Sequence, residues 1–204
     1  MTPPEPACWL HPDLEVRPSP IAGRGLFARA AVPAGTVVSR LGGRLVSTSG
    51  LRELVAQARD DDHQYVNTIV VDENSHLVLP PQAPNGCGNH SCDPNTWWLD
   101  AYTLIARRNI TAEEEVTNDY ATSTDQETFT MTCSCSSPLC RRVISGRDWQ
   151  SAELQHRYGE HWSLSCCLAS GPRETTPGID RTPYGDRYPG GLPGASCLSG
   201  RLFD

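Results

Sequence analysis

Residues 89–95 have the sequence Asn-His-Ser-Cys-Asp-Pro-Asn, and the rest of the chain is organised around this stretch. Asn, Asp, Ser and Pro bond to their own backbone or restrict it, so the stretch is predicted to be a specified loop and not a strand. Its partner is residues 115–120, Glu-Val-Thr-Asn-Asp-Tyr, a short strand candidate that ends in a tyrosine. A strand pattern lies between the two segments, so we expect their ends to meet on one sheet.

Composition limits the classes of protein to consider. A chain of 204 residues is long enough for one full domain and a small extra module. Its formal charge of −7, from 17 basic and 24 acidic residues, argues against direct nucleic-acid binding and suits a site for a basic peptide or a cation. The sequence has neither an apolar run that could span a membrane nor a recognisable signal peptide. We therefore expect an intracellular monomer, cytoplasmic or nuclear.

Short β-rich runs dominate the first two thirds of the chain. The strand candidates are residues 14–16, 36–39, 44–46, 68–71, 76–79, 96–106 (as one long strand) and 115–120. Residues 49–60 have the pattern of a helix capped by Ser49, with Leu51, Leu54, Val55 and Ala58 on one face. A second helix is predicted at 148–157, with Asp148 as its cap and a Glu153–Arg157 pair.

Both ends of the chain have the composition of irregular structure. Residues 1–13 are rich in proline and are predicted to be flexible. From residue 165 to 204 the chain is rich in Pro, Gly, Ser and Thr without a period, which predicts a disordered tail. Its cysteines lack metal-like spacing, and we expect deletion of the tail to leave thermal stability nearly unchanged.

Three cysteines stand close together in the second half of the chain. Cys133, Cys135 and Cys140 form a C-x-C-x4-C set flanked by Ser and Pro, which fits a metal site better than an apolar core. Zinc takes four ligands, so one ligand is missing from this set. Cys92 in the central loop is the best candidate for the fourth; Cys87 is the alternative, and Cys8 is remote.

Two glycines one residue apart, Gly23 and Gly25, flank Arg24 near the start of the chain. Glycine allows a positive φ and a close approach of the backbone to a ligand. A plain turn between two strands explains the same pattern.

Taken together, these motifs resemble the SET-domain protein-lysine methyltransferases. The matching stretches are Gly-Arg-Gly-Leu-Phe at 23–27, the loop at 89–95, Glu-Glu-Val-Thr-Asn-Asp-Tyr at 114–120, and the three clustered cysteines. The resemblance implies a mainly β SET-domain fold of small β-sheets with a pseudoknot, plus short helices. It implies a SET domain at 14–120 and a post-SET zinc-binding segment at 121–145. The helix predicted at 148–157 then defines a C-terminal helical segment at 146–164.

The resemblance also implies roles for individual residues. Gly23, Arg24 and Gly25 would lie along the amino-acid and ribose portions of S-adenosyl-L-methionine. Asn89 and His90 would hold this cofactor through backbone bonds and the Asn89 side chain. Tyr120 would be the catalytic tyrosine and touch the cofactor; the alternative is a half-buried strand tyrosine. The family's Zn²⁺ site would use Cys92, Cys133, Cys135 and Cys140.

The activity implied is methyl transfer from the cofactor's sulfonium to a deprotonated lysine amine in a narrow channel. The substrate would be a protein with an accessible lysine, histone-like or otherwise basic. Aromatic candidates for the channel or the cofactor wall are Tyr65, Trp97, Trp98, Tyr102 and Phe129, with an ordinary core role favoured for Trp98 and Tyr102.

The sequence departs from the family pattern at three places. Residues 85–88 replace a usual Arg-Phe pair, Glu113 stands where glycine is usual, and Asn118 replaces the usual Phe or Tyr two positions before the active tyrosine. Because of the polar Asn118, the number of methyl groups added cannot be transferred from the family. The departures also leave open a second hypothesis, a non-catalytic SET-like zinc-containing interaction module.

Overall fold

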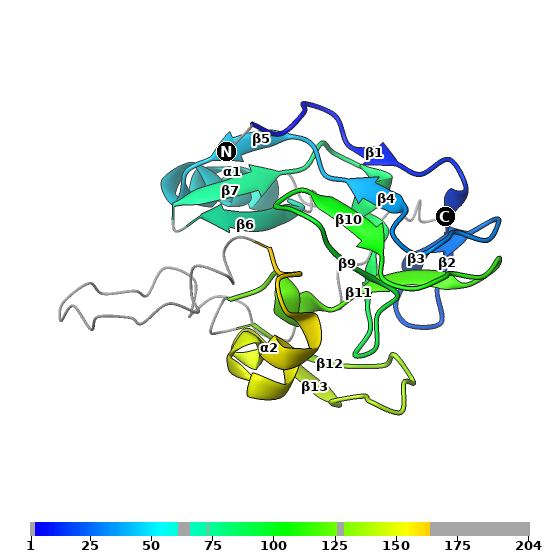
Figure 1. Cartoon of the computed structure of the whole chain (residues 1–204). Coiled ribbons are helices and arrows are strands. Elements are labelled where there is room, and N and C mark those ends of the chain that lie inside the picture. Colours follow the sequence, from blue (N-terminus) through cyan, green and yellow to red (C-terminus); the bar gives the residue numbers. More distant parts are fainter. Residues whose placement is uncertain (1–2, 61–65, 73, 126–128, 164–204) are drawn as a thin grey trace, which may run out of the picture.

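The computed structural model describes residues 3–60, 66–72, 74–125 and 129–163. Short strands in small sheets are the main regular structure of this part, with two α-helices and three single 3₁₀ turns between or after them (Figure 1). The predicted mainly β fold of small sheets with short helices is therefore confirmed. None of the helices in the described ranges is long and apolar enough to cross a membrane.

The first sheet has the order β1 (Trp9–Leu10), β4 (Val37–Arg40), β10 (Thr103–Ala106) and β9 (Thr96–Trp98), with antiparallel neighbours. Two predictions fail here. Residues 9 and 10 are paired to β4 although the N-terminal segment was expected to be irregular. The long strand predicted at 96–106 is a hairpin, because the Asp100 carboxylate accepts the Tyr102 N–H (2.8 Å) and closes a turn.

The second sheet carries both motif-bearing segments. Its order is β2 (Leu14–Pro18), β3 (Arg24–Ala28), β11 (Glu115–Asn118) and β8 (Asn89–His90). The β8 and β11 strands are parallel, and Asn118 is in register with His90. The loop predicted at 89–95 thus begins with a two-residue strand. The main apolar cluster packs around this sheet and the neighbouring first sheet; it contains Leu14, Leu26, Ala28, Val32, Val38, Cys87, Ala106, Ile110 and Val116.

The third sheet, β5 (Arg44–Val46), β7 (Ser75–Val78) and β6 (Thr68–Asp72), carries the helix α1 (Thr48–Asp60). The predicted apolar face is confirmed, because Leu51 is buried and Leu54, Val55 and Ala58 are partly buried while most of the helix is exposed. The predicted cap is displaced by two residues. The Ser47 hydroxyl, not that of Ser49, accepts the Gly50 N–H (3.1 Å).

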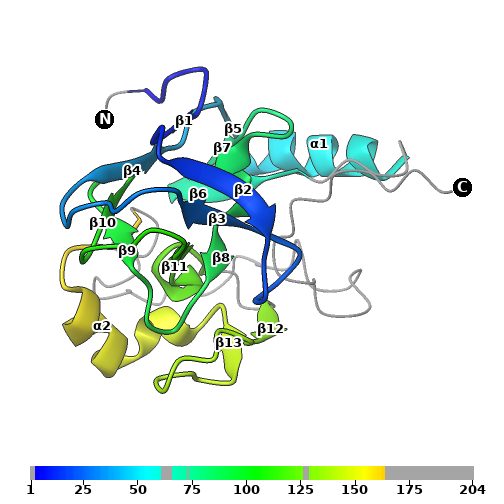
Figure 2. The ribbon, with the colours of Figure 1, turned by 90° about the vertical axis from the view of Figure 1, so that its right-hand side faces the viewer.

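The C-terminal part lies on the far side of the molecule from α1 (Figures 1 and 2). It contains the hairpin of β12 (Thr130–Thr132) and β13 (Val143–Ser145) and the helix α2 (Ala152–Tyr158). The helix predicted at 148–157 is split, because Asp148–Gln150 forms a separate 3₁₀ turn and Ser151 precedes α2. The Glu153–Arg157 pair is confirmed at 2.7 Å. The predicted disordered tail and Tyr65 lie outside the described residues.

Candidate functional site

Parallel pairing of β8 with β11 brings the two motif segments together, as the sequence predicted. Directly after β11, Asp119 caps a 3₁₀ turn that begins at Tyr120, so Tyr120 leaves the sheet instead of continuing the predicted strand. The Tyr120 N–H donates to Nδ1 of His90 (3.1 Å), and the two rings lie 5.3 Å apart between centroids. The tyrosine is therefore fixed to the loop at both its backbone and its ring.

Tyr120 lies between two cavities. One has a volume of about 210 Å³ and the other about 200 Å³, and Tyr120 is the residue that lines both. Its hydroxyl donates to the Gly88 carbonyl (3.0 Å), and Gly88 belongs to the wall of the larger cavity. A phenol at this junction can contact two different ligands at once.

The smaller cavity is lined by polar and apolar residues together. Its walls are Ile21, Ala22, Asn89, His90, Tyr120, Met131, Thr132 and Ser134. Of the residues predicted to bind a cofactor, Asn89, His90 and Tyr120 therefore line this cavity. Gly23, Arg24 and Gly25 are next to Ala22 in sequence but are not among its lining residues in the described part of the chain. Sequence analysis missed Met131, Thr132 and Ser134, which the β12 strand and the cysteine loop carry.

The Asn89 side chain holds the turn at 22–25 beside this cavity. It is buried, and its amide donates to the carbonyls of Ala22 (3.2 Å) and Arg24 (3.1 Å) and to Glu115 (2.8 Å). This holds the 22–25 turn, in which Gly23 has a positive φ of 47°. A Cβ on Gly25 would lie 2.1 Å from the Glu115 carboxylate, so a side chain there would displace the carboxylate that accepts from Asn89.

The larger cavity has mainly apolar walls with a polar edge near Tyr120. Trp98 and Phe129 line it, as do Asn118 and apolar residues of the main sheets. Trp98 is also a core residue, 2% exposed, so the favoured core role and the wall role both hold. Trp97 instead stacks on His161, with ring centroids 3.6 Å apart. Tyr102 packs against the core, and its hydroxyl has no hydrogen-bond partner among the described residues.

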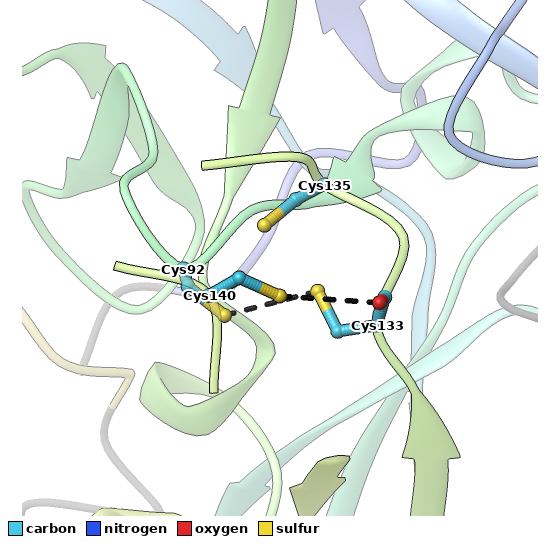
Figure 3. A group of neighbouring side chains, drawn as sticks. All are labelled: Cys92, Cys133, Cys135 and Cys140. Atoms are coloured by element: carbon cyan, nitrogen blue, oxygen red, sulfur yellow. Dashed lines mark hydrogen bonds between the residues drawn. The ribbon is translucent and has the colours of Figure 1, made fainter. Parts of the chain in front are cut away.

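The four predicted metal ligands come together although Cys92 lies 41 residues before Cys133. All four sulfurs of Cys92, Cys133, Cys135 and Cys140 lie within 4.8 Å of one another and point toward a common centre (Figure 3). Zn–S bonds of about 2.3 Å in a tetrahedron imply sulfurs about 3.8 Å apart. The Cys92–Cys133 separation is 3.8 Å, so the set fits a closed four-thiolate zinc site.

The other cysteine candidates have different surroundings. Cys87 is fully buried within the main apolar cluster, and Cys8 bonds to Gly42. Within the cluster, burial raises the pKa of Cys92 to about 11. Burial also opposes ionisation of Cys135, but hydrogen bonds from its neighbours outweigh burial and lower its pKa to about 7. Grouped thiols that ionise so unequally need a cation before all four can be thiolates.

His90 connects the cysteine cluster to Tyr120. Its Nδ1 accepts the Tyr120 N–H, so its proton is on Nε2, which lies 3.3 Å from Cys92 Sγ. Burial lowers the pKa of His90 to about 4, which keeps the ring neutral and able to bond in both directions.

Asp119 forms the centre of a buried network that sequence analysis missed. Its carboxylate accepts two hydrogen bonds from Arg141, at 2.7 Å each, and one from the Tyr158 hydroxyl (2.8 Å). Burial would raise the pKa of Asp119, but the Arg141 guanidinium outweighs burial and holds it below its usual value. Arg141 follows Cys140, and its N–H donates to Cys92 Sγ (3.3 Å), so the network and the cysteine cluster share one segment.

Similarity to known proteins agrees with this geometry. Residues 23–121 match the family model described as SET domain. The chain is 29% identical over 136 residues to histone-lysine N-methyltransferase ash1 of Drosophila melanogaster. It is 25% identical over 134 residues to an H3 lysine-36 specific histone-lysine N-methyltransferase of Cryptococcus neoformans. It is 30% identical over 146 residues to an H3 lysine-4 specific one of Mycosarcoma maydis.

These matches cover 61%, 61% and 64% of this chain but only 6%, 16% and 10% of the respective relatives. Among solved structures, the methyltransferase domain of human histone-lysine N-methyltransferase SETMAR aligns with a TM-score of 0.52 at 21% identity. That alignment covers 65% of this chain and 58% of the other. At this identity the likeness supports the fold alone. Motifs, cavities and matched relatives lead to one conclusion: residues 23–121 of this chain are similar to the SET-domain family, whose model they match.

Proposed function

We propose that this protein is an S-adenosyl-L-methionine-dependent protein-lysine N-methyltransferase. The observation that carries the proposal is the position of the Tyr120 phenol between two cavities. Donor and acceptor in a methyl transfer must meet in line at near-attack distance. A site with two chambers and one polar group at their junction suits this requirement. The names of the relatives, all histone-lysine N-methyltransferases, give independent support.

The smaller cavity is the proposed cofactor site. Its residues fit an amphiphilic ligand, since the polar residues Asn89 and His90 line it beside the apolar residues Ile21 and Met131. When bound, S-adenosyl-L-methionine supplies an electrophilic methyl group on a sulfonium. The chain's contribution is to hold the turn at 22–25 with the Asn89 amide and to close one wall with Tyr120.

The larger cavity is the proposed lysine channel. Apolar walls such as Leu26, Trp98 and Phe129 suit the methylene chain of lysine and disfavour its ammonium form. The substrate amine first loses a proton to water. The neutral amine would then have a free lone pair to accept the methyl group that the bound cofactor would supply. Tyr120 and the Gly88 carbonyl orient the amine at the junction.

The cysteine cluster is the proposed structural zinc site. Cys92, Cys133, Cys135 and Cys140 fill all four positions, so no site remains open for substrate and the metal serves to hold segments together. The metal joins the loop at 89–95 to the segment that supplies Met131 and Thr132 to the smaller cavity. Metal binding is thus a condition for the cofactor wall.

The proposed substrate class is a basic protein with an accessible lysine. The net charge of −7 favours basic partners over nucleic acid. The relatives are named for different lysines of histone H3, lysine-36 and lysine-4, so their names support the class of substrate and not one target. We propose that the protein acts inside the cell as a monomer.

Tyr120→Phe tests the proposal. The variant keeps the ring between the cavities, so we expect unchanged folding and calorimetric binding of S-adenosyl-L-methionine. Transfer of labelled methyl to core histones or to a cell lysate should fall at least about 100-fold, because the hydroxyl that orients the amine is lost. Tyr102→Phe is the matched control, since the Tyr102 hydroxyl has no partner among the described residues. Zinc-loaded protein that never binds the cofactor would contradict the proposal.

One observation favours a second candidate, a non-catalytic SET-like interaction module. Asn118 places a polar carboxamide in the wall of the larger cavity, where it could alter or block the positioning of a lysine amine. Cofactor binding by calorimetry without label transfer to any protein of a lysate would support this candidate. Turnover by the wild-type protein, lost in Tyr120→Phe, would reject it.

A further inference from the structure

Residues 157–163 follow the cysteine segment in sequence and contact the 3₁₀ turn at 120–122. We name residues 157–163 the C-terminal strap. The Arg157 guanidinium donates to the Cys92 carbonyl (2.9 Å), and the Tyr158 hydroxyl donates to Asp119 (2.8 Å). The first bond thus reaches Cys92 in the loop at 89–95, and the second reaches Asp119, the residue directly before Tyr120. In Figure 2, α2 and β13 both lie below β11.

The strap continues along the same turn. His161 Nδ1 lies 2.8 Å from the Trp98 carbonyl, and the Ser163 N–H donates to the Thr122 carbonyl (2.8 Å). Trp98 lines the larger cavity, and its indole N–H donates to the Thr122 hydroxyl (3.0 Å). The strap thus fixes the last residue of the 3₁₀ turn that Tyr120 begins, together with one wall of the larger cavity.

An apolar cluster locks the strap in place. Tyr158 and Trp162 pack edge to face, with ring centroids 5.7 Å apart, and join Ala121, Trp149 and Leu154. Tyr158 is 1% exposed, so its hydroxyl bonds to Asp119 without competition from water. Burial of this kind fixes the Asp119 carboxylate in one orientation.

The Asp119 carboxylate in turn holds the 3₁₀ turn that begins at Tyr120. Its Oδ1 accepts the Ala121 N–H (3.0 Å), and its backbone carbonyl accepts the Thr122 hydroxyl (2.6 Å). These two bonds define the turn that carries Tyr120 out of the sheet. Arg141 also holds this carboxylate, so the Tyr158 hydroxyl supplies a third bond to it. Without that third bond the carboxylate is held less firmly, which weakens its bond to the Ala121 N–H and loosens the turn that carries the phenol.

We propose that the C-terminal strap positions Tyr120 for methyl transfer, with Tyr158 as the positioning residue that acts through Asp119. The inference rests on the proposed function. Tyr158 lines neither cavity and is not a catalytic residue. The strap also lies beyond residue 121, where the family match ends, so it is an addition to the matched domain.

Tyr158→Phe in the full zinc-loaded chain tests the strap, with Tyr102→Phe as the matched control. Tyr158→Phe removes one hydroxyl and keeps the packed ring. We expect kcat for methyl transfer to fall at least 10-fold, while the Kd of S-adenosyl-L-methionine, the KM of the histone substrate and the zinc content stay within twofold. A merely structural role would lower the melting temperature without this split between kcat and KM.

Hydrogen–deuterium exchange gives a readout that does not depend on activity. The amides of Ala121 and Thr122 should exchange at least fivefold faster in Tyr158→Phe, while those of β2 and β3 stay unchanged. Arg157→Met should produce a smaller change near Cys92, because it removes the donor to the Cys92 carbonyl and the pair with the exposed Glu153 but keeps the Tyr158 bond to Asp119. If the exchange of the amides at 121–122 is unchanged, or if kcat is unchanged in an active enzyme, the proposal that the strap positions Tyr120 is wrong. If the wild-type protein shows no turnover, the proposed function is rejected. Hydrogen–deuterium exchange alone then tests whether the strap holds the turn at 120–122.

Discussion

Glu113 occupies a backbone conformation that favours glycine. Its φ is +70°, in the left-handed region, where a side chain costs about 1–2 kcal/mol. The family usually has glycine at this position, and the observed φ supplies the physical reason. Glu113 also pairs with Arg17, but its side chain is 68% exposed, and such pairs contribute at most about 1 kcal/mol. The backbone cost should therefore exceed the gain from the ion pair.

Glu113→Gly is expected to raise the free energy of unfolding, by about 0.5 kcal/mol in 0.5 M salt, where the ion pair is screened. Glu113→Gln separates the two effects, since it loses the ion pair and keeps the strained φ; it should be neutral or slightly destabilising. Denaturant titration of the three proteins measures the difference. A glycine variant less stable than the glutamine variant would show that the turn does not store this strain.

Glu114 predicts a pH dependence of stability. Burial would raise its pKa, but hydrogen bonds from Arg108, Thr111 and Asn95 outweigh burial and lower it to about 2. A group with a depressed folded pKa stabilises fully above its unfolded pKa near 4.5 and loses that effect as the pH falls toward 2. Between pH 6.5 and 4 the wild type should lose about 1 kcal/mol more than Glu114→Gln.

Denaturant titrations at pH 6.5, 5 and 4 measure this loss for both proteins. Glu53→Gln is the control, because Glu53 is exposed on α1 and should follow the wild type. Parallel stability curves for wild type and Glu114→Gln would contradict the depressed pKa.

Sequence reasoning at the scale of single residues succeeded where chemistry restricts the choice. Zinc needs a fourth thiolate, and Cys92 rather than Cys87 completes the set in the structure. Asp119 could not be identified in this way, because its partners Arg141 and Tyr158 are 22 and 39 residues away in sequence. Long-range polar pairs leave no periodic signal. The role of Asn89 toward a cofactor stays a prediction, and the structure adds that its side-chain amide holds the neighbouring turn.

At the scale of elements, most strand positions could be predicted, and the breaks could not. Residues 96–106 form a continuous apolar pattern in which Asp100 is the lone turn signal, so the β9–β10 turn depends on one local hydrogen bond. The β8 strand has only two residues, both polar, and exists because β11 supplies its parallel partner. The turn at Tyr120 forms because the Asp119 carboxylate caps it. At this site, contacts between distant segments determine the structure more than local sequence preference does.

The break before α2 has a similar origin. A single helix over 148–157 would satisfy local propensity, yet Asp148 is held by Ser145 (2.8 Å) and Arg141 (3.1 Å), and Trp149 is buried in the strap cluster. Those contacts favour a separate 3₁₀ turn. Tertiary packing thus overrides a helix propensity worth only tenths of a kcal/mol per residue.

At the scale of the whole molecule, one cluster of cysteines, the proposed zinc site, joins parts that are far apart in the sequence. The loop at 89–95 borders the smaller cavity and carries Cys92, while the segment at 129–145 supplies Cys133, Cys135 and Cys140. Among the described residues, Cys92, Cys133 and Ile144 form only a small apolar cluster there, with Phe129 and Met131 packed against it. So small a core leaves much of the attachment to the metal.

Removal of zinc should therefore lower stability and cofactor affinity together. We expect one zinc per chain by elemental analysis. Metal at 1,000 times its Kd contributes about 4 kcal/mol, so a strong chelator should lower the melting temperature by about 10 °C. Binding of S-adenosyl-L-methionine should be lost in the same titration, because Met131 and Thr132 leave the cavity wall when the cysteine segment detaches. Cys135→Ser should reproduce both losses, whereas Cys8→Ser, outside the cluster, should retain one zinc and normal binding. A chelated protein that still binds the cofactor with unchanged affinity would separate the metal from the site, and the cofactor wall would then have to be held by β8 and β11 alone.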